Sequence, residues 1–505
     1  KAANTSLTSS SSSSSQLSKT DTAVLHEERI TQFRTTGLLP VLFSVMQVYS
    51  FVTEETNHLL YMALEVMSIL IETNDVNRGK MVGLGACVFV IEILHRHQRH
   101  EDLVVAATRA VQCLATTPAS SFLTVQESDY SLSAPAGGAA WGGQKVPANI
   151  EQLSEGGGCE TVIWSLQTFF HNREIALHVL GAVHRLTTGE LDNRLKIGEC
   201  GGAGALHECL KLHAAEEDIG LLLCLVLGSL CKECKENSNQ FGELGTCQLL
   251  LLLFETYGCT NSTLAAAAAR ACAYLSTFLR RDASQAMKLL APLKGLLSVM
   301  ASSLHTFPSD QLLTFWVIFA INELLYEPLR LPSAQSGEAT MPTKFNHSFL
   351  EYTPLTCECL VTALSTHLKS NEKVSQICFI TLSNLMAFFC ECSGADASSS
   401  AAQWHDCIAA HDMATQMTTA LTQYKANPII CFACLKSLHF LSVCEGPHLF
   451  LKVHKALLAA MSFHNSDELV LQWGCQAIGS MALDSQNRDV LVAGGACEAV
   501  VGALH

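Results

Sequence analysis

Three features of this sequence combine residue types and spacings that could support chemistry. Cys231 and Cys234 form a CxxC pair, which is half of a zinc or redox site. His405 and Cys407 supply the residue types of a thiol nucleophile and its base. Gly494 and Gly495 begin a glycine-containing stretch that could cradle a phosphate. Each reading implies a different class of protein.

The cysteine features lack the partners that chemistry needs. The nearest companions of the CxxC pair, Cys357 with Cys359 and Cys390 with Cys392, have the wrong spacing and lie far along the chain. With 20 histidines and 22 cysteines, a His and a Cys that are close in sequence are expected by chance. No GxSxG, HExxH, kinase or Rossmann signature is present. The sequence therefore predicts no enzyme, no catalytic residue, no metal site and no cofactor.

The glycine pair belongs to a repeat. An Asn stands eight residues before a Gly in four segments: Asn77 and Gly85, Asn193 and Gly201, Asn237 and Gly245, Asn487 and Gly495. Gly157, Gly201 and Gly245 are 44 residues apart in turn. A phosphate loop usually follows a strand and carries a Lys, whereas here a helical segment precedes the Gly and no GK[ST] follows. A Gly at a helix end supplies left-handed backbone, so these glycines are predicted to separate helices.

The elements between the glycines have helical periodicity. Apolar residues recur at i, i+3, i+4 and i+7 after each Gly, and again in a longer run such as Ala106–Ala115 or Gly474–Leu483. Alternation of period two is nearly absent. The predicted unit is a short helix beginning near the Asn, a Gly break, a second helix, a polar turn and a long third helix. The chain is therefore predicted to be all-α.

Two segments carry a resemblance to a known family. They are GLLPVLFSVM at 37–46 and LQWGCQAIGSMALDSQNRDVLVAGGACEAVVGAL at 471–504. Both resemble armadillo repeats, which implies an armadillo-type solenoid, a right-handed α-α superhelix of about nine to ten three-helix repeats. In this register one residue marks each third helix: Ile69, Cys113, Arg185, Ser229, Thr277, Glu323, Asn384, Ser437 and Ser480.

Composition divides the chain into a tail and a solenoid with insertions. Residues 1–25 are predicted to be a disordered Ser-rich tail and residues 26–505 the solenoid. Insertion loops are predicted at about 117–156, 327–350 and 392–402, where Ser, Gly and Ala replace helical periodicity. The last repeat is truncated before its third helix, so a longer protein is expected.

Charge and hydropathy exclude several partners. The longest apolar runs, Leu221–Cys231 and Cys247–Phe254, are too short to span a membrane. A net charge of −15 disfavours nucleic-acid binding, and His95–His100 is expected to be a solvated helix end and not an anion site. Reduced cysteines acting as small core residues favour a cytoplasmic protein, with nuclear or cytoskeletal locations as alternatives.

The resemblance also places a candidate binding groove. In the family the third helices line a groove that binds peptides or partner helices, and nuclear-import adaptors carry Trp and Asn there. Here no Trp occupies the Trp position and only Asn384 keeps the Asn, which argues against a receptor for nuclear-localisation peptides. The groove candidates are Arg109, Arg185, Leu225, Ser229, Ala273, Thr277, Phe319, Glu323, Ile380 and Asn384, with Leu225, Ala273, Phe319 and Ile380 as an apolar strip. The alternative at each position is packing against a neighbouring repeat.

These features favour a non-catalytic scaffold. The expected partner is a protein, bound as a peptide or an amphipathic helix, with no small-molecule substrate. One alternative is a regulatory arm of a larger enzyme, such as a kinase or ubiquitin ligase, and another is a structural component of a cytoskeletal or ciliary assembly. We expect Phe319→Asp or Leu225→Asp to abolish partner capture without unfolding the array.

Overall fold

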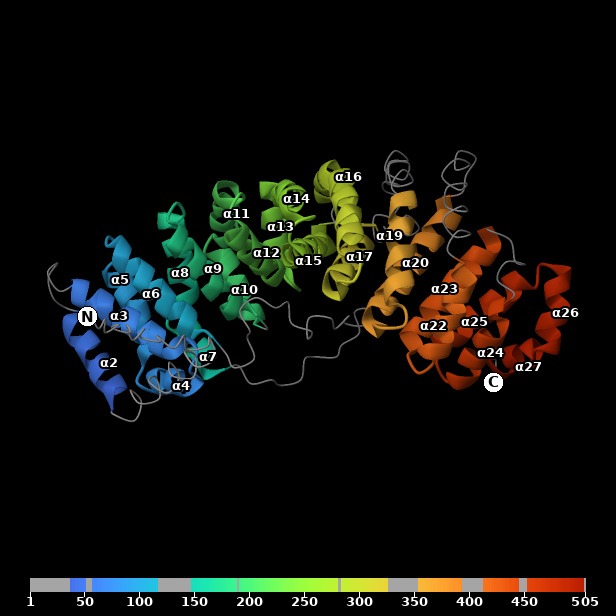
Figure 1. Ribbon diagram of the computed structural model, residues 1–505, viewed down its shortest axis with the longest axis horizontal. Coiled ribbons are helices and arrows are strands. Elements are labelled where there is room, and N and C mark those ends of the chain that lie inside the picture. The colour runs from blue at the N-terminus through green and yellow to red at the C-terminus, as the bar shows by residue number, and fades with distance from the viewer. Residues whose placement is uncertain are drawn as a thin grey trace, which may run out of the picture. The chain divides into compact units, whose positions relative to one another are not determined.

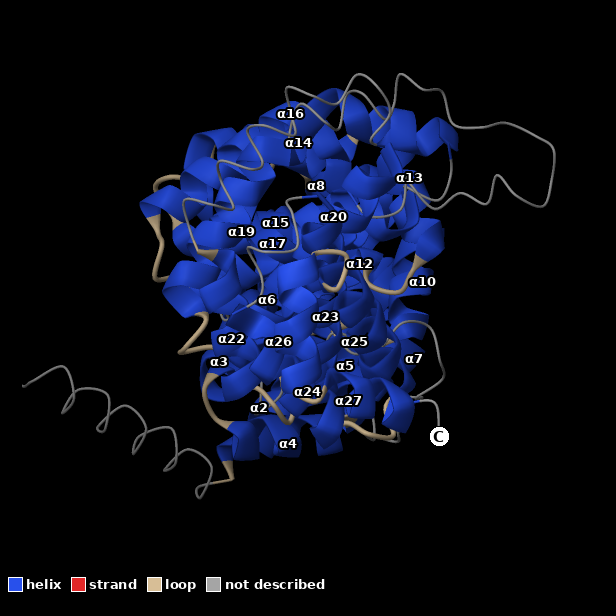
Figure 2. Ribbon diagram, turned by 90° about the vertical axis from the view of Figure 1, so that its right-hand side faces the viewer, coloured by secondary structure: helices blue, strands red, loops and turns tan. Residues whose placement is uncertain are grey.

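The computed structural model of the protein is built from helices. It describes residues 37–50, 57–116, 147–188, 190–279, 283–325, 353–392, 412–444 and 452–503. No strand occurs in these residues (Figure 2). No helix among them is long and apolar enough to cross a membrane. The predicted tail, the insertion at 327–350, His405 and Cys407 lie outside the described residues, as does most of the insertion at 392–402.

The chain divides into two compact units. Residues 1–120 and 146–161 form the first unit, and residues 121–145 and 162–505 form the second, so that the boundary falls within helix α8 (Gly158–Phe169). The helices of the first unit are α2 (Leu38–Tyr49), α3 (Asn57–Glu72), α4 (Asp75–Gly83), α5 (Ala86–Arg96), α6 (Glu101–Leu114) and α7 (Ala148–Glu155). Helix α7 occupies the end of the segment that was predicted to be a loop at 117–156.

The first part of the second unit repeats a pattern of three helices (Figure 1). After α9 (Arg173–Thr187) come α10 (Leu191–Glu199), α11 (Gly202–His213) and α12 (Glu217–Cys231), and then α13 (Lys235–Leu244), α14 (Thr246–Tyr257) and α15 (Ser262–Leu279). Each triplet is a short helix, a second helix and a longer third helix, as the periodicity predicts.

Further along, the described helices come in pairs. They are α16 (Ala283–Thr306) with α17 (Gln311–Leu325), α19 (Thr353–His367) with α20 (Glu372–Cys392), α22 (Met413–Gln423) with α23 (Pro428–Cys444), and α24 (His454–Phe463) with α25 (Glu468–Met481). A short helix returns as α26 (Ser485–Ala493), followed by α27 (Ala496–Ala503). Helix α16 runs unbroken for 24 residues, and no residue within it has left-handed backbone to end a short helix.

The predicted helix breaks are confirmed at the glycines. Six glycines have positive φ angles between 73° and 91°: Gly37, Gly85, Gly157, Gly201, Gly245 and Gly495. The left-handed conformation is costly for a residue with a Cβ atom, so glycine is the residue that can end one helix and start the next without strain.

The Asn of the repeat does not start the short helix but ties it to the preceding third helix. Asn77, Asn193, Asn237 and Asn487 are each the third residue of their helix, and all four are buried. The side-chain amide of Asn193 donates to the carbonyl of Leu186 at 2.8 Å, and that of Asn237 donates to Leu230 at 3.1 Å. These bonds satisfy carbonyls near the end of a helix, which lack an intrahelical donor.

The third helices of the second unit form a series. Helices α9, α12, α15, α17, α20, α23 and α25 follow one another in chain order, each packed against the next (Figure 1). The nine predicted register residues all lie in long helices: two in α3 and α6 of the first unit, and seven in this series. The predicted register of the third helices is therefore confirmed within the described residues.

Candidate partner-binding face

Polar side chains join four consecutive third helices of the second unit. Thr277 on α15 lies 3.0 Å from Glu323 on α17, and the neighbouring Asn322 donates to Glu323 at 3.2 Å. The Nδ2 atom of Asn384 on α20 donates to the Oδ1 atom of Asn322 at 3.0 Å. Lys436 on α23 donates to the Oδ1 atom of Asn384 at 3.2 Å. We call these five residues the polar ladder.

The polar ladder is mostly buried. Asn322, Glu323 and Lys436 are 6%, 8% and 6% exposed, while Thr277 and Asn384 are half-buried. The Nζ atom of Lys436 also lies 5.6 Å from the centre of the Trp473 ring on α25, within the range of a cation–π contact. Buried polar groups need partners, and here each helix supplies partners to its neighbour.

An apolar row runs beside the polar ladder. Tyr274, Phe319, Ile380 and Phe432 each lie three or four residues before a ladder residue on α15, α17, α20 and α23. Side chains at that spacing occupy the same face of a helix. All four are half-buried, and the rings of Tyr274 and Phe319 are 6.2 Å apart. We call these four residues the anchor row.

Some of the predicted groove residues belong to the anchor row or the polar ladder, and others are buried within the array. Phe319 and Ile380 belong to the anchor row, and Thr277, Glu323 and Asn384 belong to the polar ladder. By contrast, Leu225 is 2% exposed, Ala273 is fully buried and Ser229 is 2% exposed, with its hydroxyl 3.2 Å from His184. The alternative of packing against neighbours therefore holds at these three positions.

The two predicted arginines lie apart from the polar ladder. Arg185 is half-buried on α9 of the second unit. Arg109 belongs to the first unit, where its guanidinium lies 2.5 Å from Glu65 and 3.3 Å from Glu72. Both acids stand on α3, so this cation joins two third helices.

The sequence reasoning missed Tyr274, Asn322, Phe432 and Lys436. It took two register positions four residues apart from each helix, whereas Asn322 and Lys436 stand directly before the second of these positions on α17 and α23. A signal was present in the sequence: a large apolar residue stands one turn before each ladder position.

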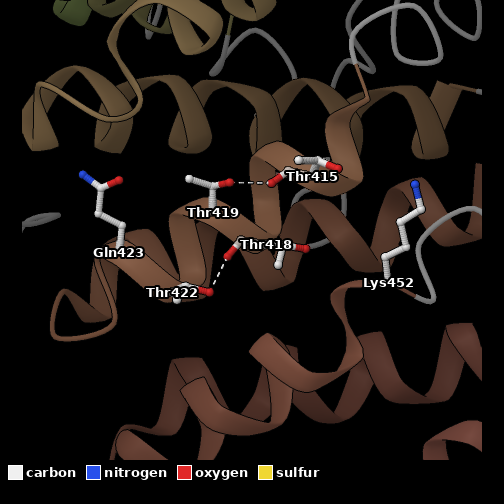
Figure 3. Close-up of a pocket in the computed structure, with 6 residues that line it drawn as sticks. All are labelled: Thr415, Thr418, Thr419, Thr422, Gln423 and Lys452. Atoms are coloured by element: carbon white, nitrogen blue, oxygen red, sulfur yellow. Dashed lines mark hydrogen bonds between the residues drawn. The ribbon is translucent and has the colours of Figure 1, made fainter.

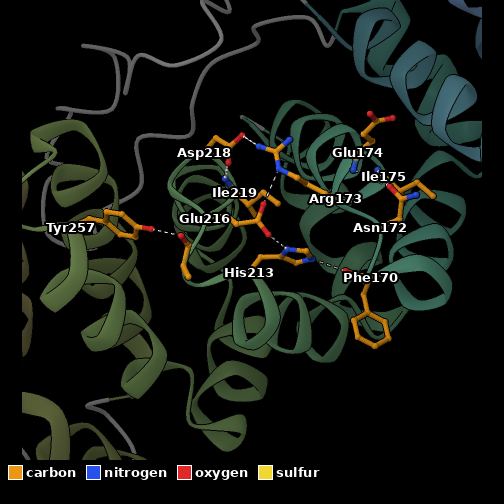
Figure 4. A network of polar contacts seen from close by, with 11 residues as sticks. Phe170, Asn172, Arg173, Glu174, Ile175, His213, Glu216, Asp218, Ile219 and Tyr257 are labelled. Atoms are coloured by element: carbon orange, nitrogen blue, oxygen red, sulfur yellow. Dashed lines mark hydrogen bonds and ion pairs between the residues drawn. The ribbon is translucent and has the colours of Figure 1, made fainter.

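A second set of polar contacts fixes the turns between second and third helices (Figure 4). The Nε2 atom of His213 lies 2.8 Å from the carbonyl oxygen of Phe170, and its Nδ1 atom lies 2.7 Å from Glu216. Arg173 donates to Glu216 at 2.8 Å and pairs with Asp218. The hydrogen bond from His213, together with that from Arg173, lowers the pKa of Glu216.

The His213 contact recurs along the described chain. A His or Tyr at the end of a second helix reaches the carbonyl of the preceding turn at six places: His97 to Ser50, His213 to Phe170, Tyr257 to Ala215, His367 to Pro308, Tyr424 to Leu368 and His464 to Lys425. Within His95–His100, both Arg96 and His97 contact the Ser50 carbonyl. These turn contacts hold consecutive repeats in register.

The cysteines of the CxxC pair are buried in the array. Both are 1% exposed, and burial raises the pKa of the Cys231 thiol and of the Cys234 thiol. A metal ligand or nucleophile must be a thiolate, which this environment disfavours. Among the described residues no group of His, Cys, Asp and Glu is arranged to hold a metal ion.

The glycine pair Gly494 and Gly495 also has a structural role. Gly495 has a φ of 91° at the break between α26 and α27. The cysteine two places after the glycine is buried at Cys87, Cys159 and Cys247, but Cys497 is exposed. The expectation that cysteines act as small core residues therefore holds at three of these positions and not at Cys497.

A hollow of about 520 Å³ lies on α22, a second helix (Figure 3). Thr415, Thr418, Thr419, Thr422, Gln423 and Lys452 line it. The hydroxyls of Thr418, Thr419 and Thr422 donate to carbonyls four residues earlier in α22. The hydroxyl of Thr415 donates instead to the carboxylate of Asp412 at 2.6 Å. The hydroxyl hydrogens of these four threonines are therefore engaged within the protein.

Comparisons with known proteins identify similar structures but no similar sequence. No protein-family model matches the chain, and no curated protein matches it. An engineered protein of known structure aligns over 91% of this chain and 93% of its own, with a TM-score of 0.64 and 14% identity. A structure from a study of a phosphorylation switch in the interaction between cadherin and β-catenin aligns over 89% and 69%, with a TM-score of 0.59 and 13% identity. A designed armadillo repeat protein covers 57% of this chain and 99% of its own, at 16% identity and a TM-score of 0.42. At such identities the likeness concerns the fold alone.

Proposed function

Because the chain folds as an armadillo-type solenoid, we propose that it is a non-catalytic scaffold that binds a partner protein along the third helices of its second unit. The observation that carries this proposal is the anchor row. Its four half-buried apolar side chains stand on four consecutive third helices, so a partner bound along these helices would meet one of them on each. The proposal is the same whether the solenoid acts alone, as an arm of a larger enzyme or within a cytoskeletal or ciliary assembly.

Two further observations support the proposal. The first favours binding over catalysis, and the second favours a cytoplasmic location. The polar residues of the third helices are engaged with one another and are not grouped around a nucleophile or base. Most of the described cysteines are buried, as expected for small core residues of a protein in a reducing compartment.

The test is a matched pair of double variants in the full chain. Phe319→Asp with Ile380→Asp places two charges in the anchor row. Leu212→Asp with Leu252→Asp places two charges on second helices of the same unit, where these leucines are 51% and 47% exposed. We expect affinity purification and mass spectrometry to show loss of specific partners for the first pair only, while both pairs keep the helical circular dichroism of the parent. An unchanged set of partners for the folded anchor-row variant would refute the proposal.

Leu225→Asp is not a suitable variant for this test. Leu225 is 2% exposed, so a carboxylate there would be buried among apolar groups at a cost of several kcal/mol. The burial of Leu225 therefore argues against the expectation that this substitution leaves the array folded. We expect it instead to lower the melting temperature, with any loss of partners following from unfolding.

A further inference from the structure

We infer that two copies of the chain associate face to face through the outer side of α2 and α3 in the first unit (Figure 1). This inference goes beyond the proposed function and does not depend on it, because the anchor row belongs to the second unit. The surface consists of six apolar side chains, which we call the end face: Val41, Val45, Leu59, Met62, Val66 and Ile69.

The end face is exposed and follows one side of each helix. Its six side chains are between 38% and 57% exposed. Val41 and Val45 are one turn apart on α2, and the four residues on α3 follow one another at intervals of three or four, so they share one side of that helix. The opposite side of α3 carries Leu60, Leu64 and Met67, which are fully buried. Apolar residues on both sides are typical of a helix that is covered on both sides.

The equivalent positions are covered in the next repeat. Gly37 and Gly85 set an offset of 48 residues between α2 and α5, and the register residues set one of 44 between α3 and α6. The residues at these offsets are at most 8% exposed: Phe89, Ile93, Leu103, Ala106, Ala110 and Cys113. The preceding helices cover them, since the ring of Phe89 lies 5.2 Å from that of Phe43 on α2 and α6 packs along α3. The end face is therefore the surface on which one repeat receives packed helices from its neighbour.

The charges beside the end face allow an identical copy to approach. In a two-fold symmetric interface the same surface of both copies meets, so an unpaired charge is repelled by its own equivalent. Helix α2 has no charged residue, and α3 has two acids and no Lys or Arg. Both acids, Glu65 and Glu72, pair with Arg109 of α6 in the same copy. No uncompensated carboxylate, Lys or Arg therefore remains on α2 or α3.

This neutrality favours a second copy over a partner of different sequence. The chain has a net charge of −15, so a partner selected by charge would be basic and would bind where acids are unpaired. The helices of the end face offer no such acid. A second end face supplies the apolar side chains of two packed helices, and charged residues are depleted at the core of such interfaces.

The size of the end face sets the strength of the association. Helices α2 and α3 have 12 and 16 residues and are therefore about 18 and 24 Å long. A face made of two such helices lies at the small end of specific interfaces, which bury about 800 Å² of each partner. We therefore expect a reversible dimer with a dissociation constant in the micromolar range.

The experiment is sedimentation velocity of the full chain between about 1 and about 100 μM, over which monomer should give way to dimer. Met62→Glu with Val66→Glu places two charges in the end face and should weaken the association by at least about tenfold. Val76→Glu with Val88→Glu is the matched control, because it changes the net charge equally. These valines are 53% and 44% exposed on α4 and α5 of the same unit, outside the end face, so the control should associate like the parent.

A mixture of oppositely charged variants tests whether two copies of the same face meet. Met62→Lys with Val66→Lys should be monomeric alone, as should the Glu variant, and both should keep the helical circular dichroism of the parent. Mixed at low salt, the two variants should form a heterodimer, because opposite charges then meet across the interface. Absence of a heterodimer would show that the substitutions do not act on a shared face, and would overturn the inference.

Two further outcomes would overturn it. A parent chain that remains monomeric at about 100 μM would leave a different protein, or another segment of this chain, as the occupant of the end face. A dimer that the Glu variant and its control weaken equally, or that neither weakens, would place the interface elsewhere. The proposed function is unaffected in each case, because its variants lie in the second unit.

Discussion

The left-handed glycines divide helices because of their backbone alone. Gly245 has a φ of 75°, and a Cβ atom added there would meet nothing within 4 Å. Gly245→Ala should therefore lower stability by about 1–2 kcal/mol through conformational strain, measured by urea denaturation. Gly204 is the matched control, because it lies inside α11 with equal space and without a left-handed φ.

We expect Gly204→Ala to leave stability unchanged or to raise it by up to about 1 kcal/mol, because Ala is the better helix former. An equal loss for the two substitutions would show that crowding, and not dihedral angle, sets the cost at Gly245.

Burial makes most of the described thiols poor nucleophiles. It raises the pKa of Cys209 and that of Cys224 to about 12, whereas Cys259 and Cys497 are exposed. Among the described cysteines, we expect brief treatment of the native chain with iodoacetamide at neutral pH to modify Cys259 and Cys497 first, because thiolate is the reactive form and these two thiols are accessible. Peptide mass spectrometry would measure the order. Early modification of Cys224 would show that α12 opens readily, and urea-unfolded chain provides the control in which all sites react.

At the scale of elements, the turn contacts make stability depend on pH. His367 is 2% exposed at the end of α19, and its Nε2 atom lies 2.9 Å from the carbonyl oxygen of Pro308. Burial lowers the pKa of His367 below 6.5 against the opposing effects of that carbonyl and of Asp310. The unfolded chain therefore takes up the proton first, and the contribution of this joint is lost as pH falls below about 6.5.

His367→Gln should reduce this loss because Gln can still donate to Pro308 but does not titrate in this range. We expect the melting temperature to fall less for the variant than for the parent between about pH 7.5 and about pH 5.5. Some loss should persist, because burial also lowers the pKa of His207 and that of His97. An identical fall in parent and variant would mean that this joint does not contribute.

The helices themselves could be predicted because burial of one helix face requires apolar residues at a regular spacing in the sequence. A helix buried on one face repeats its apolar residues every three to four positions, so the third helices could be located from residues such as Leu225 and Asn384. The exposure of those residues could not be predicted, because it depends on the neighbouring helix. Leu225 is covered in an array where Arg270 of α15 lies 3.5 Å from its carbonyl oxygen, while Phe319 stays half-buried.

The polar ladder could not be predicted from the sequence for a different reason. Asn322 and Asn384 bond across 62 positions of sequence, with an insertion between them. Fixed register positions on each helix cannot show which side chains meet, because the insertion changes the spacing between α17 and α20. The unbroken course of α16 could not be predicted either, because a helix without a left-handed glycine keeps the same apolar period.

At the scale of the whole molecule, a solenoid transmits stability from neighbour to neighbour. Each repeat contacts mainly the adjacent ones, so the effect of a core substitution should remain local. The tryptophans of the described residues allow a test, because Trp164, Trp316 and Trp473 all lie in the second unit. Tryptophan fluorescence therefore reports the second unit, while circular dichroism at 222 nm reports the helices of both.

Leu64→Ala removes a fully buried side chain from α3 in the first unit, and Leu382→Ala does the same in α20 of the second. Each should cost about 2–5 kcal/mol locally, because the deletion leaves a cavity in a packed core. In urea, Leu64→Ala should shift part of the circular dichroism transition to lower concentration and leave the fluorescence midpoint in place. Leu382→Ala should lower the fluorescence midpoint. If Leu64→Ala moves both signals together, the two units unfold as one, because the described tryptophans lie in the other unit.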